Sequence, residues 1–226
     1  MTRTGHPAGP VPGPVVGLLL AAGIGRRFDP EGRRDKLLAD AGGIAVATRA
    51  ARNLADACDR VIAVVRPGAS TLREALAAGG AAEIVECPDA RLGMGHSLAH
   101  GAFAASVHRP RRIVLALADM PWIEPATIRA LVAAADAADA ADGGDAQEGD
   151  ASTDAGTIAV PVYHDQRGHP VVFGAAHLAA LGRCEGDRGA AALLSEYPVE
   201  RIAVEDAGVI RDVDKPADLL REPNED

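Results

Sequence analysis

The sequence predicts an α/β protein in which a mostly parallel β-sheet lies between two layers of helices. Two observations predict this class. Short runs of apolar, β-branched residues alternate along the chain with longer segments of helical pattern, as they do in successive βαβ units. These runs also lack the polar alternation of a half-exposed strand, which indicates strands covered on both faces, as in a three-layer, Rossmann-like fold. Ligands of such sheets bind beyond the carboxyl ends of the strands, so the residues after each strand are the candidates for a site.

The apolar runs and the helical segments between them give the expected elements in order. The predicted strands are Val15–Leu20, Val61–Val65, Glu83–Glu86, Ile113–Ala118 and Thr157–Val162. The predicted helices are Val46–Ala57, Thr71–Ala78, His96–Ser106 and Pro125–Ala135.

Composition favours one soluble domain. The chain has 226 residues, of which 48% are hydrophobic and 24% charged, and no apolar run is long enough to cross a membrane. We expect residues 1–14, rich in Gly and Pro and without the apolar centre of a signal peptide, to be a disordered lead, and residues 15–226 to form the domain. The three cysteines are widely spaced, which favours reduced thiols in a cytoplasmic protein over a zinc site.

Most of the negative charge lies in one low-complexity segment at about residues 133–156. It carries seven acidic side chains and no basic one, and without them the net charge of −9 would be about −2. We expect a disordered acidic insertion here, although its alanines allow its start to extend the preceding helix. The chain has no basic cluster interleaved with aromatic residues, so nucleic acid is not an expected partner.

The first predicted strand ends in LAAGIGRRF, a loop that is both flexible and cationic. Small residues allow a ligand to approach the backbone, glycines let N–H groups turn inward, and arginines add charge, a combination that suits a polyphosphate. A glycine-rich turn with solvent-facing arginines is the alternative. The chain has no Gly-Lys pair for a P-loop, and Phe28 stands where a dinucleotide fingerprint needs a small residue. The candidate binding residues are Leu20, Ala21, Ala22, Gly23, Gly25, Arg26 and Arg27.

Lys36 follows this loop and is one of only two lysines among 23 basic residues. In a chain so biased toward arginine, a lysine hints at a need for a compact ammonium group rather than a planar guanidinium. A chance lysine is the alternative, and the position of Lys36 shortly after a phosphate-type loop favours the functional interpretation.

Asp119 directly follows the fourth predicted strand, where a carboxylate suits a Mg²⁺ ion shared with a phosphate. The alternative role is a helix cap, for which Glu124 is nearer the next helix. Near the C-terminus, Asp212 and Asp214 alternate along what we interpret as a short strand, so we expect only one of them to face the site. Asp218 is expected to serve the final helix.

Six motifs in order carry a resemblance to the MobA-like nucleotidyltransferase family, and it runs from about Val15 to Leu220. They are LAAGIGRRF with KLL, LGMGHSL, LADMPWI, RGHPVVF, GDRGA and DVDKPADL. Ala22, RGHPVVF and GDRGA resemble the branch of CTP:molybdopterin cytidylyltransferases (the MocA type). Lys215 departs from that branch, which usually has Thr there. The resemblance implies the fold of the nucleotide-diphospho-sugar transferases.

The resemblance further implies transfer of CMP from CTP to the terminal phosphate of molybdopterin, with release of pyrophosphate. Lys36 and Arg26 would stabilise charge at the phosphates, while Asp119 and Asp214 would hold Mg²⁺ as the cofactor. Ala21, Ala22 and Ser97 would line the base. A phosphate acceptor is already ionised at pH 7 and needs no general base, in agreement with the absence of a nucleophile–base pair among the motifs.

The acceptor side is expected to use RGHPVVF and EGDRGA. His169 and Arg188 are the candidates there, and His169 is equally well interpreted as a turn residue before Pro170. His96 and His100 have a spacing that could bind a metal, but no third ligand is evident, which favours surface or packed histidines.

Other functions stay open on the sequence alone. They are a nucleotidyltransferase of the same fold that uses GTP or a sugar or alcohol phosphate, an NAD(P)H-dependent oxidoreductase of the nicotine blue type, and a non-catalytic chaperone for molybdoenzymes. A transient contact with a recipient molybdoenzyme is compatible with the leading hypothesis, since the product must be handed on.

Overall fold

The computed structural model describes residues 13–23, 25, 27–31, 33–142, 156–187 and 189–220. Its sheet contains β1 (Val15–Leu20), β2 (Arg60–Val65), β3 (Glu83–Glu86), β4 (Arg112–Leu117), β5 (Ile158–Tyr163), β6 (Gln166–Arg167), β7 (Val171–Gly174) and β8 (Val199–Ala203). The strand order is β3-β2-β1-β4-β7-β5-β6, and β8 pairs with β5. Strands β3, β2, β1 and β4 are parallel to one another, whereas β7 is antiparallel to both β4 and β5. The predicted α/β class with a mostly parallel sheet is confirmed.

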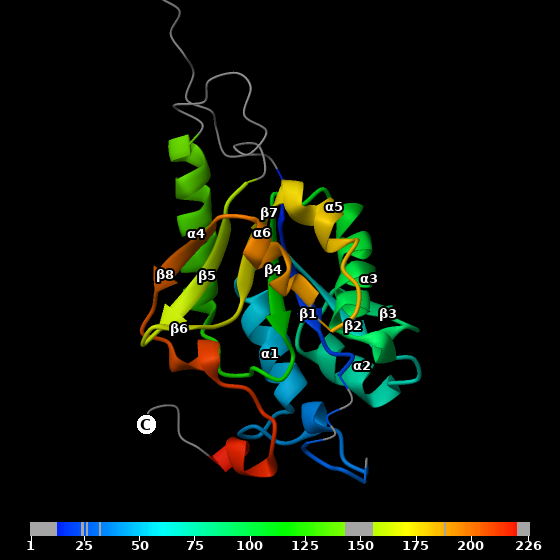
Figure 1. Cartoon of the computed structure of the whole chain (residues 1–226). Coiled ribbons are helices and arrows are strands. Elements are labelled where there is room, and N and C mark those ends of the chain that lie inside the picture. Colours follow the sequence, from blue (N-terminus) through cyan, green and yellow to red (C-terminus); the bar gives the residue numbers. More distant parts are fainter. Residues whose placement is uncertain are drawn as a thin grey trace, which may run out of the picture.

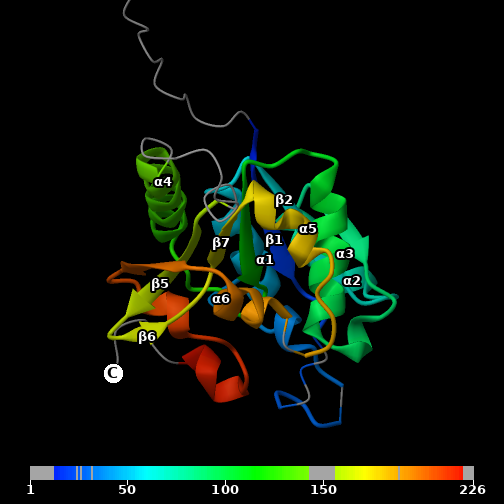
Figure 2. The same cartoon turned by 45° about the horizontal axis from the view of Figure 1, so that its top comes forward.

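Helices cover both faces of this sheet (Figures 1 and 2). The α-helices are α1 (Val46–Ala55), α2 (Ser70–Ala78), α3 (Met94–Ser106), α4 (Pro125–Asp142), α5 (Leu178–Leu181) and α6 (Leu193–Glu196). Those 3₁₀ turns that matter for the site are η1 (Lys36–Leu38), η2 (Ala90–Leu92), η5 (Ala207–Ile210) and η6 (Pro216–Leu220).

The two faces of β1 divide the core. Val15 and Leu19 pack in a cluster with α1, α2 and α4, and Val16 and Leu18 pack in a second cluster with α3, α5 and α6. All six residues of β1 are buried, which explains why its sequence shows no polar alternation.

The acidic segment begins as a continuation of α4, the alternative that its alanines allowed. α4 continues to Asp142, so residues 133–142 are helical and residues 143–155 lie outside the described residues. Two of the acidic side chains are fixed by the buried guanidinium of Arg112, whose Nε and Nη2 lie 2.8 and 2.6 Å from Asp136 and Asp139. Alanine propensity together with these ion pairs extends the helix. Of the expected N-terminal lead, Gly13 and Pro14 are described.

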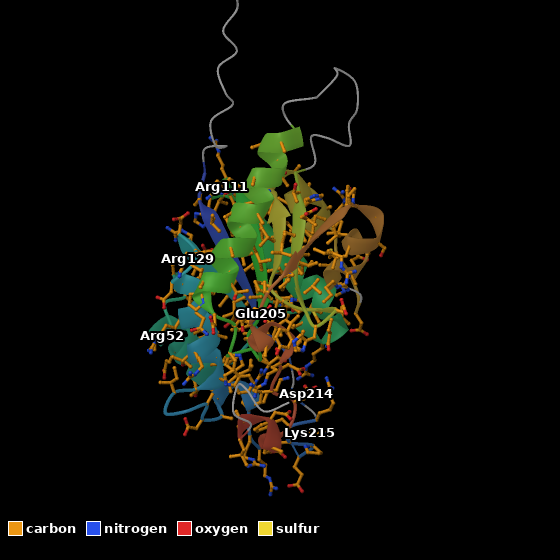
Figure 3. All side chains as sticks on the ribbon, turned by 90° about the vertical axis from the view of Figure 1, so that its left-hand side faces the viewer. Arg52, Arg111, Arg129, Glu205, Asp214 and Lys215 are labelled. Atoms are coloured by element: carbon orange, nitrogen blue, oxygen red, sulfur yellow. The ribbon has the colours of Figure 1, made fainter. Side chains whose placement is uncertain are left out.

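The carboxyl edge of the parallel strands gathers segments that are distant in sequence. In Figure 1 the blue segment after β1 and the red C-terminal segment meet below the sheet. Figure 3 shows Asp214 at this end of the molecule and Arg111, which precedes β4, toward the opposite end. The residues that follow β1, β2 and β4 are therefore neighbours in space.

Candidate active site

Three adjacent strands end at the same level, and a polar or glycine-rich segment follows each. In the sheet register Leu20 of β1 lies beside Val64 of β2 and Leu117 of β4. The glycine loop (residues 21–28) follows β1, and Arg66 follows β2. Asp119 lies two residues after the end of β4. The parallel register alone brings these three segments to one edge.

The glycine loop turns back sharply at Gly25. Gly25 has a φ of +65°, and its carbonyl accepts hydrogen bonds from the N–H groups of Phe28 (3.0 Å) and Asp29 (3.3 Å). Phe28 is buried in the core cluster beside α1, so the loop is anchored by an apolar side chain. The residue that disfavours a dinucleotide fingerprint is therefore a structural anchor.

Asp29 organises the next part of the loop. Its carboxylate accepts hydrogen bonds from the backbone N–H groups of Glu31, Arg33 and Arg34, at 3.1, 2.9 and 2.8 Å. The bond from the Arg34 N–H has the largest effect. Together the three bonds hold the pKa of Asp29 below its usual value, although burial acts in the opposite direction. The loop thus has a defined path to η1, which carries Lys36.

Lys36 extends from the start of η1 to two carboxylates. Its Nζ lies 2.7 Å from Asp119 Oδ2 and 3.2 Å from Asp214 Oδ1, and its side chain is only 10% exposed. Burial lowers the pKa of Lys36, but the two carboxylates outweigh it, so the pKa lies above its ordinary value. Lys36 is therefore a permanent cation at neutral pH and cannot act as a general base.

The C-terminal segment delivers further carboxylates to this edge. The Val213 N–H donates to the Asp119 carbonyl at 2.8 Å, which places the chain beside the end of β4. Asp218 Oδ2 accepts from the N–H groups of Asp214 (2.9 Å) and Lys215 (2.7 Å), as expected for a residue serving the final helical turn, η6. Asp214 also pairs with Arg27 of the glycine loop at 2.5 Å.

Asp212 does not line a pocket with Asp119, but both it and Asp214 bring a carboxylate close to that of Asp119, whereas only one of the two aspartates was expected on this side. One carboxylate oxygen from each of Asp119, Asp212 and Asp214 lies within 4.8 Å of the others. Residues 211–214 form no strand, so the strict alternation assumed from the sequence does not apply. Burial and then the neighbouring carboxylates Asp214 and Asp119 raise the pKa of Asp212. Within the part of the chain that is described, no other group of His, Cys, Asp or Glu has this geometry, and His96 and His100 belong to none.

A pocket of about 490 Å³ opens at this edge, between the glycine loop and the start of α3. Its volume is in the range of small-molecule sites. Nine of the predicted site residues line it: Leu20, Ala22, Gly23, Gly25, Arg27, Lys36, Ser97, Asp119 and Asp214. The others lining it are Leu37, Ala90, Arg91, Gly93, Met94, Leu117 and Asp187.

Two predicted residues are placed elsewhere. Ala21 does not line the pocket: its N–H continues the sheet by donating to the Val64 carbonyl at 2.8 Å, and its side chain packs in the core cluster of α1. His169 does not line the pocket either, and its buried Nδ1 has no hydrogen-bond partner among the described residues. Burial lowers the pKa of His169, and the nearby Asp119 carboxylate partly offsets this effect. Arg26 and Arg188 lie outside the described residues.

Several residues of this edge were not among the predicted site residues. Arg66 could have been found, because it directly follows a buried strand whose carboxyl end must lie beside that of β1. Asp35 carries the signal of a cap, since it precedes a short helical turn and its Oδ1 accepts the Leu37 N–H at 3.0 Å. Arg91 carries no such signal and lies on η2, just before α3. Asp187 belongs to the GDRGA motif that was expected on the acceptor side, and the packing of the loop at 185–187 against the start of α3 brings it to the pocket.

That packing is close enough to require glycine. The Gly95 N–H donates to the Gly186 carbonyl at 2.8 Å. A Cβ atom at Gly95 would lie 2.5 Å from the backbone of Glu185, and one at Gly93 would lie 2.3 Å from that of Gly186. The glycines of the predicted LGMGHSL motif thus allow the loop to form one wall of the pocket.

The model of the MobA-like NTP transferase domain matches residues 17–202. The chain belongs to this family. The resemblance inferred from the motifs is confirmed, and the MobA-like domain makes the protein a nucleotidyltransferase. Comparison with curated protein sequences gave no significant match.

Solved structures support the same fold. The crystal structure of Rv0371c from Mycobacterium tuberculosis is 28% identical, with a TM-score of 0.71 over 92% of this chain and 97% of that chain. A manganese complex of Rv0371c is likewise 28% identical, with a TM-score of 0.69 over 94% of this chain and 100% of the other. A nucleotidyl transferase from Methanothermobacter thermautotrophicus is 20% identical, with a TM-score of 0.71 over 93% and 96% of the two chains, a likeness that concerns the fold.

None of the helices described in this MobA-like domain combines the length and the apolar character of a membrane span.

Proposed function

We propose that the protein transfers CMP from CTP to the terminal phosphate of molybdopterin, with release of pyrophosphate. The observation that carries the proposal is the position of the Lys36 ammonium, 2.7 and 3.2 Å from the carboxylates of Asp119 and Asp214, in a pocket that the glycine loop also lines. A nucleoside triphosphate can be bound by a permanently charged ammonium group, by a divalent cation that carboxylates hold, and by the backbone N–H groups of a glycine-rich loop.

The residues of the edge take separate roles in this reaction. The backbone amides of the glycine loop and the Arg27 side chain would bind the triphosphate, as would Arg26. Lys36 would hold the α-phosphate and stabilise its charge while the acceptor attacks and pyrophosphate leaves in line. No residue needs to remove a proton, because a phosphate acceptor is ionised at pH 7. The raised pKa of Lys36 is consistent with a purely electrostatic role.

The carboxylates of Asp119, Asp212 and Asp214 fit a divalent cation. They are hard oxygen ligands gathered within 4.8 Å, as Mg²⁺ and Mn²⁺ prefer. We propose Mg²⁺ as the cofactor; when bound, it would act as a Lewis acid that screens the phosphate oxygens. The manganese complex of Rv0371c is consistent with such a site.

The choice of CTP depends on the part of the pocket near Ala22 and Ser97. Both residues line it, and Ser97 is buried at the first turn of α3, where a polar side chain can meet a nucleobase. The cytidylyl branch is favoured by the resemblance of Ala22, RGHPVVF and GDRGA. His169 and Arg188 remain proposals for the acceptor side, and hand-over to a recipient molybdoenzyme in the cytoplasm is part of the same proposal.

Pyrophosphate release from each of the four nucleoside triphosphates, with Mg²⁺ and molybdopterin, tests the proposal. We expect CTP to be preferred. Asp119→Asn and Lys36→Met should each lower kcat by about 10²–10³-fold, because each removes a group that acts on the developing charge. Glu200→Gln, an exposed carboxylate on β8, is the matched control and should leave kcat unchanged.

The other outcomes identify the rival functions. A preference for GTP, or turnover only with a sugar or alcohol phosphate, would overturn the cytidylyl assignment and keep the enzyme class. Turnover that Asp119→Asn leaves intact would contradict the role of the carboxylates. Micromolar NADH binding without Mg²⁺, measured by fluorescence, would favour the reductase.

A further inference from the structure

Arg66 lies directly after β2 and contacts two segments that belong to the pocket. Its Nη1 donates to the Gly23 carbonyl at 3.1 Å, and its Nη2 lies 2.5 Å from Asp35 Oδ2. Gly23 belongs to the glycine loop, and Asp35 precedes Lys36. Arg66 itself does not line the pocket, so its contacts are with the groups that shape the site rather than with the space for a ligand.

Asp35 connects Arg66 to the turn on which Lys36 lies. While one oxygen of Asp35 binds Arg66, the other accepts the Leu37 N–H and caps η1, the turn on which Lys36 lies. The Asp35 side chain is only 17% exposed, so the ion pair with Arg66 is partly shielded from solvent. The orientation of η1 therefore depends on a carboxylate that Arg66 holds.

The glycine loop and Lys36 also touch each other. A Cβ atom at Gly25 would lie 3.3 Å from Lys36 Cγ, so the loop backbone packs on the stem of the lysine. Because Arg66 holds the loop at Gly23 and the turn at Asp35, the aliphatic stem of Lys36 lies between two segments that cannot move freely. The planar guanidinium makes the two contacts through two different nitrogens held in a fixed geometry, whereas a lysine would have to make both from a single nitrogen.

We propose that Arg66 is a positioning residue that clamps the glycine loop to η1 and so fixes the Lys36 ammonium in the pocket. The structural role of Arg66 does not depend on the proposed function, whereas its predicted effect on turnover rests on that function. It acts through Asp35 and Gly23, so loss of Arg66 should displace Lys36 and affect the reaction more than it affects nucleotide binding.

Hydrogen exchange of the chain without ligand tests the clamp itself. Arg66→Gln and Arg66→Lys should speed exchange of backbone amides in residues 25–38, with Arg66→Lys retaining part of the protection, while peptides from β1 and β4 stay protected. Arg73→Gln is the matched control, because Arg73 pairs with Glu86 at 3.3 Å outside the pocket. Unchanged exchange in Arg66→Gln would overturn the proposal.

Steady-state kinetics then separate positioning from binding. We expect Arg66→Gln to lower kcat by about 10–100-fold with a smaller rise in KM for the nucleotide. Asp35→Asn, which removes the charge of the Arg66 partner and keeps an oxygen for the cap, should lower kcat in the same direction. The double variant should be no worse than Arg66→Gln alone, because the Arg66–Asp35 pair is already lost in that variant. Additive losses, or a loss confined to KM, would overturn the clamp. A wild-type protein without turnover of any nucleotide would refute the proposed function, and the exchange experiment would still decide on Arg66.

Discussion

Lys36 shows how one side chain acquires its chemistry from its surroundings. A lysine is an ordinary surface residue in isolation, but here the stem is buried and the ammonium meets two carboxylates. Burial alone would favour the neutral amine, and the carboxylates reverse that preference. The same residue type could have been a base in an apolar pocket, so its role follows from its neighbours.

Asp29 is a second residue whose ionisation is linked to structure, and it gives a prediction on pH. Because its pKa is lowered in the folded chain, the ionised form contributes stability above the ordinary pKa of an aspartate, and this contribution is lost as pH falls through the lowered value. The wild type should therefore be more stable than Asp29→Asn at pH 7, and the difference should shrink toward pH 3. Urea unfolding at several pH values measures it. A difference that grows on acidification would contradict the assigned hydrogen bonds.

At the scale of elements, α3 depends on close approach to the sheet. A Cβ atom at Gly101 would lie 2.3 Å from Leu18 Cδ1 and 2.8 Å from Val64 Cγ2, both buried side chains of the central strands. The helix therefore reaches the position in which its first turn lines the pocket only because this residue has no side chain.

Gly101→Ala should consequently destabilise the fold, although alanine favours helices. The clash should cost about 1–3 kcal/mol and exceed the gain in helix propensity of about 1 kcal/mol. Denaturant unfolding measures the change.

Gly182→Ala is the matched control, because its new Cβ atom would meet atoms only at 3.5 and 3.6 Å and its φ is −67°. It should be neutral or slightly stabilising. Equal effects of the two substitutions would contradict the close packing of α3.

At the scale of the whole molecule, the site joins the two ends of the described chain. Lys36 lies in the first fifth of the sequence and Asp214 close to its end, and Asp119 is between them. The pairing of β1 with β4 and the docking of Val213 on Asp119 close this arrangement. A ligand that binds only this assembled group must stabilise the entire fold.

Divalent cations should therefore raise the melting temperature. At a Mn²⁺ concentration about a hundred times Kd, the stabilisation is about 2.7 kcal/mol, or roughly 5–10 °C for a domain of this size. Asp212→Asn and Asp214→Asn should each reduce the shift, since each removes one carboxylate of the group, while Glu200→Gln should keep it. Thermal unfolding with and without Mn²⁺ checks this expectation, and an equal shift in all four proteins would place the cation elsewhere.

Much of the sheet could be predicted because its information is local. The predicted bounds of β1 and β3 agree with the structure, β2 begins one residue earlier than predicted, and β4 and β5 are each shifted by one residue at both ends. A strand that is buried on both faces has apolar residues at every position, so it can be recognised in the sequence without knowing which strands lie beside it. The edge rule for parallel sheets then led to the glycine loop and Asp119, while Lys36 was inferred from its residue type and its place after the loop.

What the sequence determined by itself is therefore the class of fold, the edge of the sheet at which the candidate site lies and the residue types present there. Tertiary structure alone decided which of them meet: Asp212 turns toward Asp119, Ala21 turns into the core, and Arg66 reaches Asp35 across 31 positions of sequence. The physical reason is the distance along the sequence over which each kind of interaction acts. Burial patterns and caps arise between residues a few positions apart, whereas charge pairing at an edge depends on how separate segments dock, which no local pattern encodes.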